Sequence, residues 1–208
     1  VIPQGKYLSG TLVLKSNIDF HLEKGAVLIS SLNQEDIMDF AKLFEDDNAC
    51  TGWDGGCFLF ACHEENITIS GEGVIYGQGD KVFIDDDVDG GAHECPLSVA
   101  AFRPRTTFLE DVTNLTVRGI TIQDAAFWTL HMAGCHHVRV QDIKILNDVR
   151  GANNDGIDPD CCKDVLITGC LVKTGDDAIV IKTTKPMTQR YGASENIVIS
   201  NCILYSHD

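Results

Sequence analysis

Residues 114–122 read NLTVRGITI, and the same pattern returns three more times in the second half of the chain. Residues 137–145 (HVRVQDIKI), 164–172 (DVLITGCLV) and 196–204 (NIVISNCIL) align with it without gaps. Each copy opens on a polar residue, alternates apolar and polar residues, turns at Gly, Asp or Asn, and alternates again. This alternation predicts two short strands that each bury one face and are joined by a tight turn.

The copies recur at intervals typical of a solenoid. The four starts are 23, 27 and 32 residues apart, and two weaker copies begin at Asn17 and Asn66, which lie 49 and 48 residues before the next start. A strand–turn–strand unit repeated at this period predicts an all-β solenoid, in which each coil buries its apolar residues against the next. The Leu-x-x-Leu-x-Leu pattern of leucine-rich repeats is absent. We therefore expect one domain over residues 1–208, with loop insertions near 33–57 and 77–98 that wall a binding cleft.

Composition excludes several classes of partner. The 208 residues carry a net charge of −15, which argues against nucleic acid and mildly against a polyanionic substrate. No apolar run approaches the roughly 20 residues that a membrane span requires. The chain opens on Val-Ile-Pro-Gln-Gly without a Met, a basic stretch or a signal peptide. We expect a fragment of a longer protein, truncated at both ends.

Nine cysteines are scattered along the chain, and none forms a zinc-type Cys-x-x-Cys pair. The favoured interpretation is that they are small buried hydrophobic residues. The repeat alignment places Cys135 beside Cys162 and Cys170 beside Cys202 on neighbouring coils. Such stacked thiols fit an interior ladder, and a disulfide between them is the alternative.

Two acidic motifs fall at equivalent places in successive coils. They read NNDGID at residues 153–158 and GDDAIV at residues 175–180. Superposing Gly-Ile on Ala-Ile places Asp155 over Asp177, so that three carboxylates, with Asp176, crowd one patch. Stacked like charges destabilise a sheet and raise at least one pKa, as an acid catalyst requires. The competing interpretations are a calcium site and a solvated acidic turn.

The segment FWTLH at residues 127–131 lies one coil earlier. Aligning Leu130 with Ile157 places Trp128 beneath Asp155. An exposed Trp beside acids predicts a stacking platform for a sugar ring, whereas a core Trp is the structural alternative.

At these motifs the sequence resembles glycoside hydrolase family 28, the polygalacturonase family. Its Asn-Thr-Asp appears as residues 153–155 and its Gly/Gln-Asp-Asp as residues 175–177, and further similarities occur at residues 1–31, 52–55, 71–79 and 127–131. The resemblance implies a right-handed, single-stranded parallel β-helix that hydrolyses pectin-type polysaccharide with inversion and needs no metal or other cofactor. Asp176 would protonate the glycosidic oxygen, while Asp155 and Asp177 would activate water. An inverting pair is expected to be roughly 6.5–9.5 Å apart.

Five other residues are candidates for contacts with the substrate. Asn153 belongs to the first acidic motif, and Trp128 lies beneath it. Lys182 and Arg150 are the nearest cations that could hold a substrate carboxylate, or they pair with a neighbouring Asp. His207 stands where the family's Gly-His-Gly is expected, although its flanking residues differ.

Two other classes of function remain open on the sequence alone. A lyase on the same fold would bind calcium through the acids, and a carbohydrate-binding β-helix would have no catalytic role for them. The implied location is secreted or periplasmic, and the sequence gives no indication of the oligomeric state.

Overall fold

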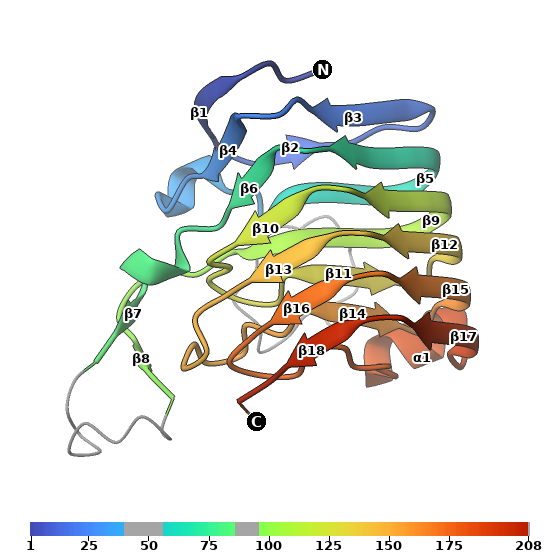
Figure 1. Ribbon diagram of the computed structural model, residues 1–208. Helices are drawn as coiled ribbons and strands as arrows, with labels where there is room; N and C mark the ends of the chain where they lie inside the picture. The colour runs from blue at the N-terminus through green and yellow to red at the C-terminus, as the bar shows by residue number, and fades with distance from the viewer. Residues whose placement is uncertain (40–55, 86–95, 208) are drawn as a thin grey trace.

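The computed structural model describes residues 1–39, 56–85 and 96–207. Its strands wind into stacked coils that form a right-handed parallel β-helix, as predicted (Figure 1). One sheet contains β1 (Gly5–Ser9), β4 (Ala26–Ser30), β6 (Val74–Tyr76), β10 (Thr121–Gln123), β13 (Lys144–Leu146), β16 (Leu171–Lys173) and β18 (Ile203–Tyr205).

The other large sheet bends and so supplies two faces of each coil. It contains β2 (Leu12–Val13), β3 (Ile18–Leu22), β5 (Cys57–Gly71), β9 (Arg105–Arg118), β11 (Leu130–Ala133), β12 (His136–Gln141), β14 (Ile157–Asp160), β15 (Lys163–Thr168) and β17 (Glu195–Ser200). The long strands β5 and β9 run through the bend. The first half of β9 pairs with β11, and its second half pairs with β12.

The pairing register confirms the repeat alignment. Val138 pairs with Leu115 on one side and with Val165 on the other, and Val165 pairs with Ile197. The two weaker copies are in register as well, since Ile67 pairs with both Ile18 and Leu115. The apolar residues of the pattern therefore stack in columns inside the solenoid, where full burial of each contributes roughly 1.5–3 kcal/mol.

The polar residue that opens each copy lies at a bend with a left-handed backbone. The φ angles there lie between 55° and 63°, at Asn17, Asn66, Asn114, His137, Asp164 and Asn196. Asn tolerates this conformation better than most residues. The Asn66 amide donates to Asn17 Oδ1 at 2.9 Å and accepts from Asn114 Nδ2 at 3.0 Å. We call these six stacked residues the bend ladder.

The cysteines of the described residues behave mostly as predicted. All seven are free thiols, and Cys135, Cys162 and Cys170 are among the buried ones. The Cys135 and Cys162 thiols donate to the carbonyls of Leu109 and Met132, each at 3.1 Å. Cys62 and Cys202 are only half-buried, and Cys50 and Cys95 lie outside the described residues.

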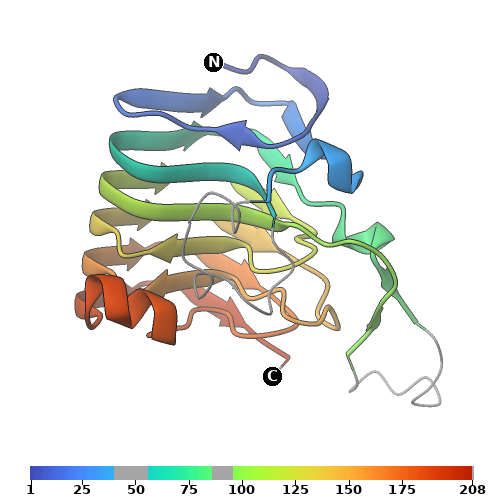
Figure 2. The same cartoon turned by 180° about the vertical axis from the view of Figure 1, so that it is seen from behind.

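Several short elements of the described residues lie outside the two large sheets. Short 3-10 helices lie at Gln34–Asp36 and Gly79–Lys81, and β7 (Phe83–Ile84) pairs antiparallel with β8 (Ser98–Val99). The single α-helix of the described chain, α1 (Lys185–Tyr191), lies behind the sheets as Figure 1 is drawn (Figure 2). It is anchored on the buried Glu110 carboxylate, which accepts from Arg190 at 2.9 Å and from the Tyr191 hydroxyl at 2.7 Å.

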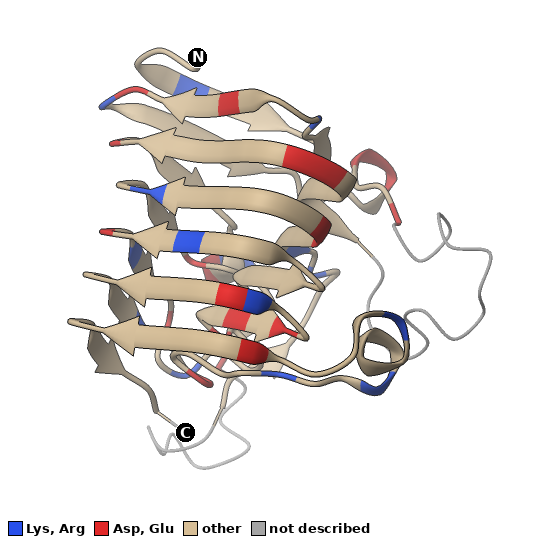
Figure 3. Cartoon of the chain, turned by 90° about the vertical axis from the view of Figure 1, so that its right-hand side faces the viewer, with Lys and Arg blue, Asp and Glu red and all other residues tan. Residues whose placement is uncertain are grey.

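Surface charge is distributed over the coils. On the face that Figure 3 presents, acidic and basic residues are interspersed over the stacked strands. No helix in the described ranges is long and apolar enough to cross a membrane.

Candidate active site

The two acidic motifs meet on neighbouring coils at the start of β14. Gly156 N donates to Asp177 O at 2.8 Å, and Ile157 N donates to Ala178 O at 3.1 Å. This pairing places Asp155 next to Asp177, which confirms the predicted register. A Cβ on Gly156 would lie 2.4 Å from Ala178 O, so only glycine allows the two backbones to approach this closely.

The three carboxyl groups form one cluster. One oxygen from each of Asp155, Asp176 and Asp177 lies within 4.8 Å of the other two. Three atoms this close have a common point that is no more than about 2.8 Å from each of them, which is an ordinary hydrogen-bond length. The distances between the three carboxyl groups are thus short enough for one water molecule to bridge two ionised groups, and a third that is protonated could donate to it.

The spacing differs from the 6.5–9.5 Å expected for an inverting pair. The nearest oxygens are at most 4.8 Å apart, because Asp155 and Asp177 occupy adjacent coils and Asp176 adjoins Asp177 in sequence. The 4.8 Å limit joins one selected oxygen of each carboxyl group, and the separation expected between the acid and base groups stays a prediction.

Burial makes the three acids unequal. Asp155 is only 2% exposed, Asp176 is half-buried and Asp177 is exposed. Burial raises the pKa of Asp155, and the charge of Asp176 adds to this effect, while the Lys182 ammonium opposes it. The Asp176 carboxylate is also oriented locally, since it accepts from Asp177 N at 2.9 Å and from Asn153 Nδ2 at 3.5 Å.

Two buried asparagines hold the loops that carry the acids. Asn154 is fully buried, and its Oδ1 accepts from Gly175 N at 2.8 Å while its Nδ2 donates to Asp148 O at 2.7 Å. Asn147 Nδ2 donates to Asn154 O at 2.8 Å. Sequence reasoning assigned no role to either amide, although Asn154 lies within the quoted motif. Asn147 lies outside both acidic motifs, and nothing in the repeat pattern indicates that its loop folds inward.

Trp128 lies beneath the cluster, but it does not form the exposed platform that was predicted. Its side chain is 5% exposed and stacks on Phe127 at 5.7 Å between ring centroids. Its ring also contacts His131 edge-on at 4.8 Å and carries the Lys182 ammonium 4.2 Å from its centroid. The platform interpretation is therefore wrong, because protein groups already occupy the ring.

The predicted cations are engaged with aspartates. Lys182 Nζ lies 2.8 Å from Asp155 Oδ2, and Arg150 donates to Asp85 Oδ2 at 2.6 Å. His207 is half-buried, and its neighbour Ser206 donates to Asp176 O at 2.7 Å, so this last segment borders the cluster.

Arg103 was missed by sequence reasoning and lies beside the cluster. It donates to Ala152 O at 2.8 Å and to Asn153 Oδ1 at 3.1 Å, and it stacks over Phe127. A usable signal exists in the sequence, since Arg-Pro-Arg at residues 103–105 is a local basic element in an acidic chain.

The fold is a right-handed parallel β-helix, and two of its neighbouring coils bring three carboxyl groups together. The model of glycosyl hydrolases family 28 matches residues 3–207, and the chain belongs to this family. This match supports the hydrolase interpretation and gives no support to the lyase or the carbohydrate-binding alternative.

Similar proteins agree with this assignment. A probable polygalacturonase of Vitis vinifera is 27% identical over 88% of this chain and 36% of its own length. An endo-polygalacturonase of Pectobacterium carotovorum subsp. carotovorum is 27% identical over 86% of the chain and 45% of its own length. The chain thus spans less than half of these two relatives.

Solved structures show the same fold. The polygalacturonase of Erwinia carotovora ssp. carotovora superposes with a TM-score of 0.74 at 23% identity, covering 95% of this chain and 52% of that one. The exopolygalacturonase of Thermotoga maritima gives 0.74 at 24% identity, covering 97% and 51%.

Proposed function

We propose that the protein hydrolyses the α-glycosidic bonds of a pectin-type polysaccharide, either polygalacturonate or rhamnogalacturonan, by general acid–base catalysis. The observation that carries the proposal is the cluster of three carboxyl groups, contributed by adjacent coils, with oxygens within 4.8 Å of one another. Crowding of like charges costs stability, so a catalytic use explains the cluster better than a structural one does. Family membership supplies the reaction class.

In this proposal Asp176 is the acid that protonates the glycosidic oxygen, and Asp155 and Asp177 accept the proton of the attacking water. Asp176 is half-buried, and its carboxylate accepts from Asn153 Nδ2 and Asp177 N, while the Ser206 hydroxyl donates to its backbone carbonyl. Asn153 and His207 are proposed to contact the sugar at the rim of the cluster. A secreted or periplasmic location is proposed as well, because pectin-type substrates lie outside the cell that digests them.

The test is release of reducing ends from polygalacturonate and from rhamnogalacturonan by the full-length protein. Asp176→Asn should lower the rate by about 100- to 10,000-fold, the usual contribution of a positioned acid. The matched control is Glu72→Gln, which neutralises an exposed acid on a turn between β5 and β6. Undiminished release by Asp176→Asn would exclude the catalytic assignment.

The stereochemical outcome needs a separate experiment. We propose inversion, which the family resemblance implies, whereas nearest oxygens within 4.8 Å are closer to the spacing of retaining enzymes. Proton NMR of the first product formed distinguishes the two, because inversion of an α-linkage releases the β-anomer. Initial release of the α-anomer would instead indicate retention.

A further inference from the structure

Lys182 lies directly behind the carboxyl cluster in a nearly closed layer. Its Nζ is 2.8 Å from Asp155 Oδ2, 3.6 Å from Asp158 Oδ1 and 4.2 Å from the centroid of Trp128. The backbone fixes this position, since Lys182 N donates to Pro159 O at 2.9 Å, and only 14% of the Lys182 side chain is exposed. One cation therefore faces two buried carboxyl groups.

The two carboxyl groups cannot be equally charged. Two carboxylates would share the single Lys182 ammonium that lies within 4 Å of both, in a layer where Asp155 is 2% and Asp158 0% exposed. Neither oxygen of Asp158 has a hydrogen-bond partner, whereas Asp155 Oδ2 has the ammonium. Burial raises the pKa of Asp158 well above its ordinary value, and the charge of Asp155 raises it further.

We propose that Lys182 is a positioning residue that keeps Asp155 ionised and oriented, while Asp158 behind it holds a proton. This inference rests on the proposed role of Asp155 as a base. Lys182 fixes Oδ2 of Asp155, and Oδ1 is the buried oxygen without a hydrogen-bond partner. Because Lys182 occupies Oδ2, the proposal assigns the proton of the attacking water to Oδ1, and Lys182 itself transfers none.

Other charged groups face this layer from each neighbouring element. Asp176 and Asp177 approach from the loop after β16, His131 from β11 and Arg105 from β9. On β14, Asp160 lies 3.5 Å from His131 Nε2 and also accepts from the Thr184 hydroxyl at 2.7 Å. Lys182 is the cation in direct contact with Asp155, so its removal should act on that carboxyl first.

The first experiment measures the pH dependence of kcat/KM for the full-length enzyme with Lys182→Met. Loss of an adjacent positive charge raises the pKa of the base, Asp155. The acidic limb, which is the low-pH side of the kcat/KM profile, should therefore move to higher pH by about one to three units. Lys182→Arg retains the charge and should return the limb toward its original place. The control Lys173→Met removes an exposed lysine at the end of β16 and should leave the limb unchanged. An unshifted limb in Lys182→Met, whatever its rate, would overturn the proposal.

The second experiment titrates the aspartate carboxyl carbons of the unmodified protein by carbon-13 NMR and needs neither turnover nor a substitution at Lys182. Asp158 should keep the chemical shift of a protonated acid at the pH where the enzyme is active. Asp158→Asn imitates that neutral acid and should not move the acidic limb. An ionised Asp158, or a limb shifted to lower pH in Asp158→Asn, would contradict the inference while leaving the proposed hydrolysis intact. Absence of hydrolysis would contradict the proposed function instead.

Discussion

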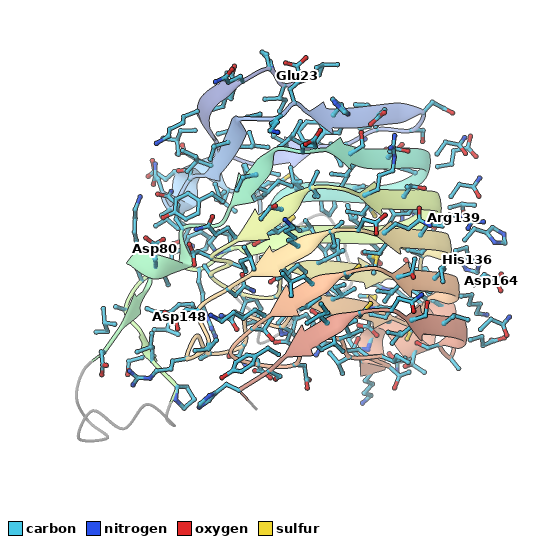
Figure 4. The ribbon with its side chains drawn as sticks, viewed as in Figure 1. Glu23, Asp80, His136, Arg139, Asp148 and Asp164 are labelled. Atoms are coloured by element: carbon cyan, nitrogen blue, oxygen red, sulfur yellow. The ribbon has the colours of Figure 1, made fainter. Side chains whose placement is uncertain are left out.

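Two edges of the same solenoid stack polar residues at the same coil spacing, with opposite consequences. In the bend ladder, three amides donate to the equivalent residue on the preceding coil: Asn66 to Asn17, Asn114 to Asn66 and Asn196 to Asp164. In the carboxyl cluster, the stacked groups are three acids that cannot donate to one another when ionised. Figure 4 shows that Asp148, from the loop leading to the cluster, lies at the opposite edge from His136 and Asp164.

The difference separates stability from function. Complementary hydrogen bonds along the bend ladder stabilise the stack, whereas like charges in the cluster oppose it. At both edges the stacked coils bring equivalent residues side by side. The type of residue then decides whether this contact stabilises or destabilises the solenoid. The comparison can be tested by making related changes at the two edges.

The largest effect is expected for Asp177→Asn in the cluster. Loss of a proposed base should lower kcat/KM by about 100- to 10,000-fold. The free energy of unfolding should not fall, because the change removes a like charge from a crowded and exposed position. Initial rates and urea unfolding of the same preparation measure both. Loss of activity accompanied by loss of stability would mean that the cluster is structural.

The second prediction concerns the buried layer behind the cluster. Burial lowers the pKa of His131 from 6.5 to about 4. As pH falls below about 6.5, the unfolded chain binds a proton that the folded chain excludes. The resulting loss of stability is complete near pH 4 and amounts to about 3 kcal/mol.

Urea unfolding across this pH range should show that His131→Phe flattens the decline. The control is Phe108→Leu, which loosens the same layer without removing a titrating group, since Phe108 packs 4.9 Å from the His131 ring. It should lower stability by a similar amount at every pH. If the unfolding free energy of His131→Phe falls as steeply with pH as that of the unmodified protein, a group other than His131 causes the pH dependence.

Substitution in the bend ladder should affect stability and leave catalysis unchanged. Asn66→Ala removes two hydrogen bonds and places a Cβ without a local hydrogen-bonding group at a φ of 55°. We expect a loss of about 1–2 kcal/mol in unfolding free energy. Asn66→Gly removes the same hydrogen bonds, but glycine adopts a φ of 55° without strain. The difference in unfolding free energy between the two variants therefore measures the cost of placing a Cβ in this conformation. A change in kcat/KM in either variant would contradict this prediction, because it would show that the bend ladder influences the carboxyl cluster.

The smallest effect is expected for Asp164→Asn, the same chemical change as in the cluster but made in the bend ladder. Asp164 is exposed, lies 3.5 Å from His137 Nδ1 and accepts from Asn196. An amide can still accept from Asn196, so unfolding free energy should change by no more than about 0.5 kcal/mol. Activity should match that of the unmodified protein. A large loss of stability would show that the carboxylate itself matters at this edge.

Features that repeat along the chain could be predicted from its sequence. The coil register followed from aligning apolar positions, and that register brought Asp155 beside Asp177. Helix α1 was missed because seven residues inside one 32-residue interval give no periodic signal. Its boundary signals were nevertheless present, with Thr184 and Pro186 at the start and Gly192 at the end.

The environment of each site residue was harder to predict than its position. The exposure of Trp128 depends on which groups pack on its ring, and neither His131 nor Lys182 is adjacent to it in sequence. Likewise, the buried amide of Asn154 joins loops from two coils. The register of the coils predicts which residues are neighbours. The burial of a site residue also depends on the loops that cover it, and the paths of these loops do not follow from the repeat.

The unequal coil intervals have a consequence for how such a protein can change. Equivalent bend residues are separated by as few as 23 and as many as 49 residues, yet their strands remain in register. Added length leaves the solenoid as loops, such as the segment that carries α1 between Lys182 and Glu195. New sequence can therefore be inserted around the carboxyl cluster while the distances between its members are preserved. Under the proposed function, loop grafting around the cluster is thus a route to a different range of polymers that leaves the three proposed catalytic carboxyl groups in place.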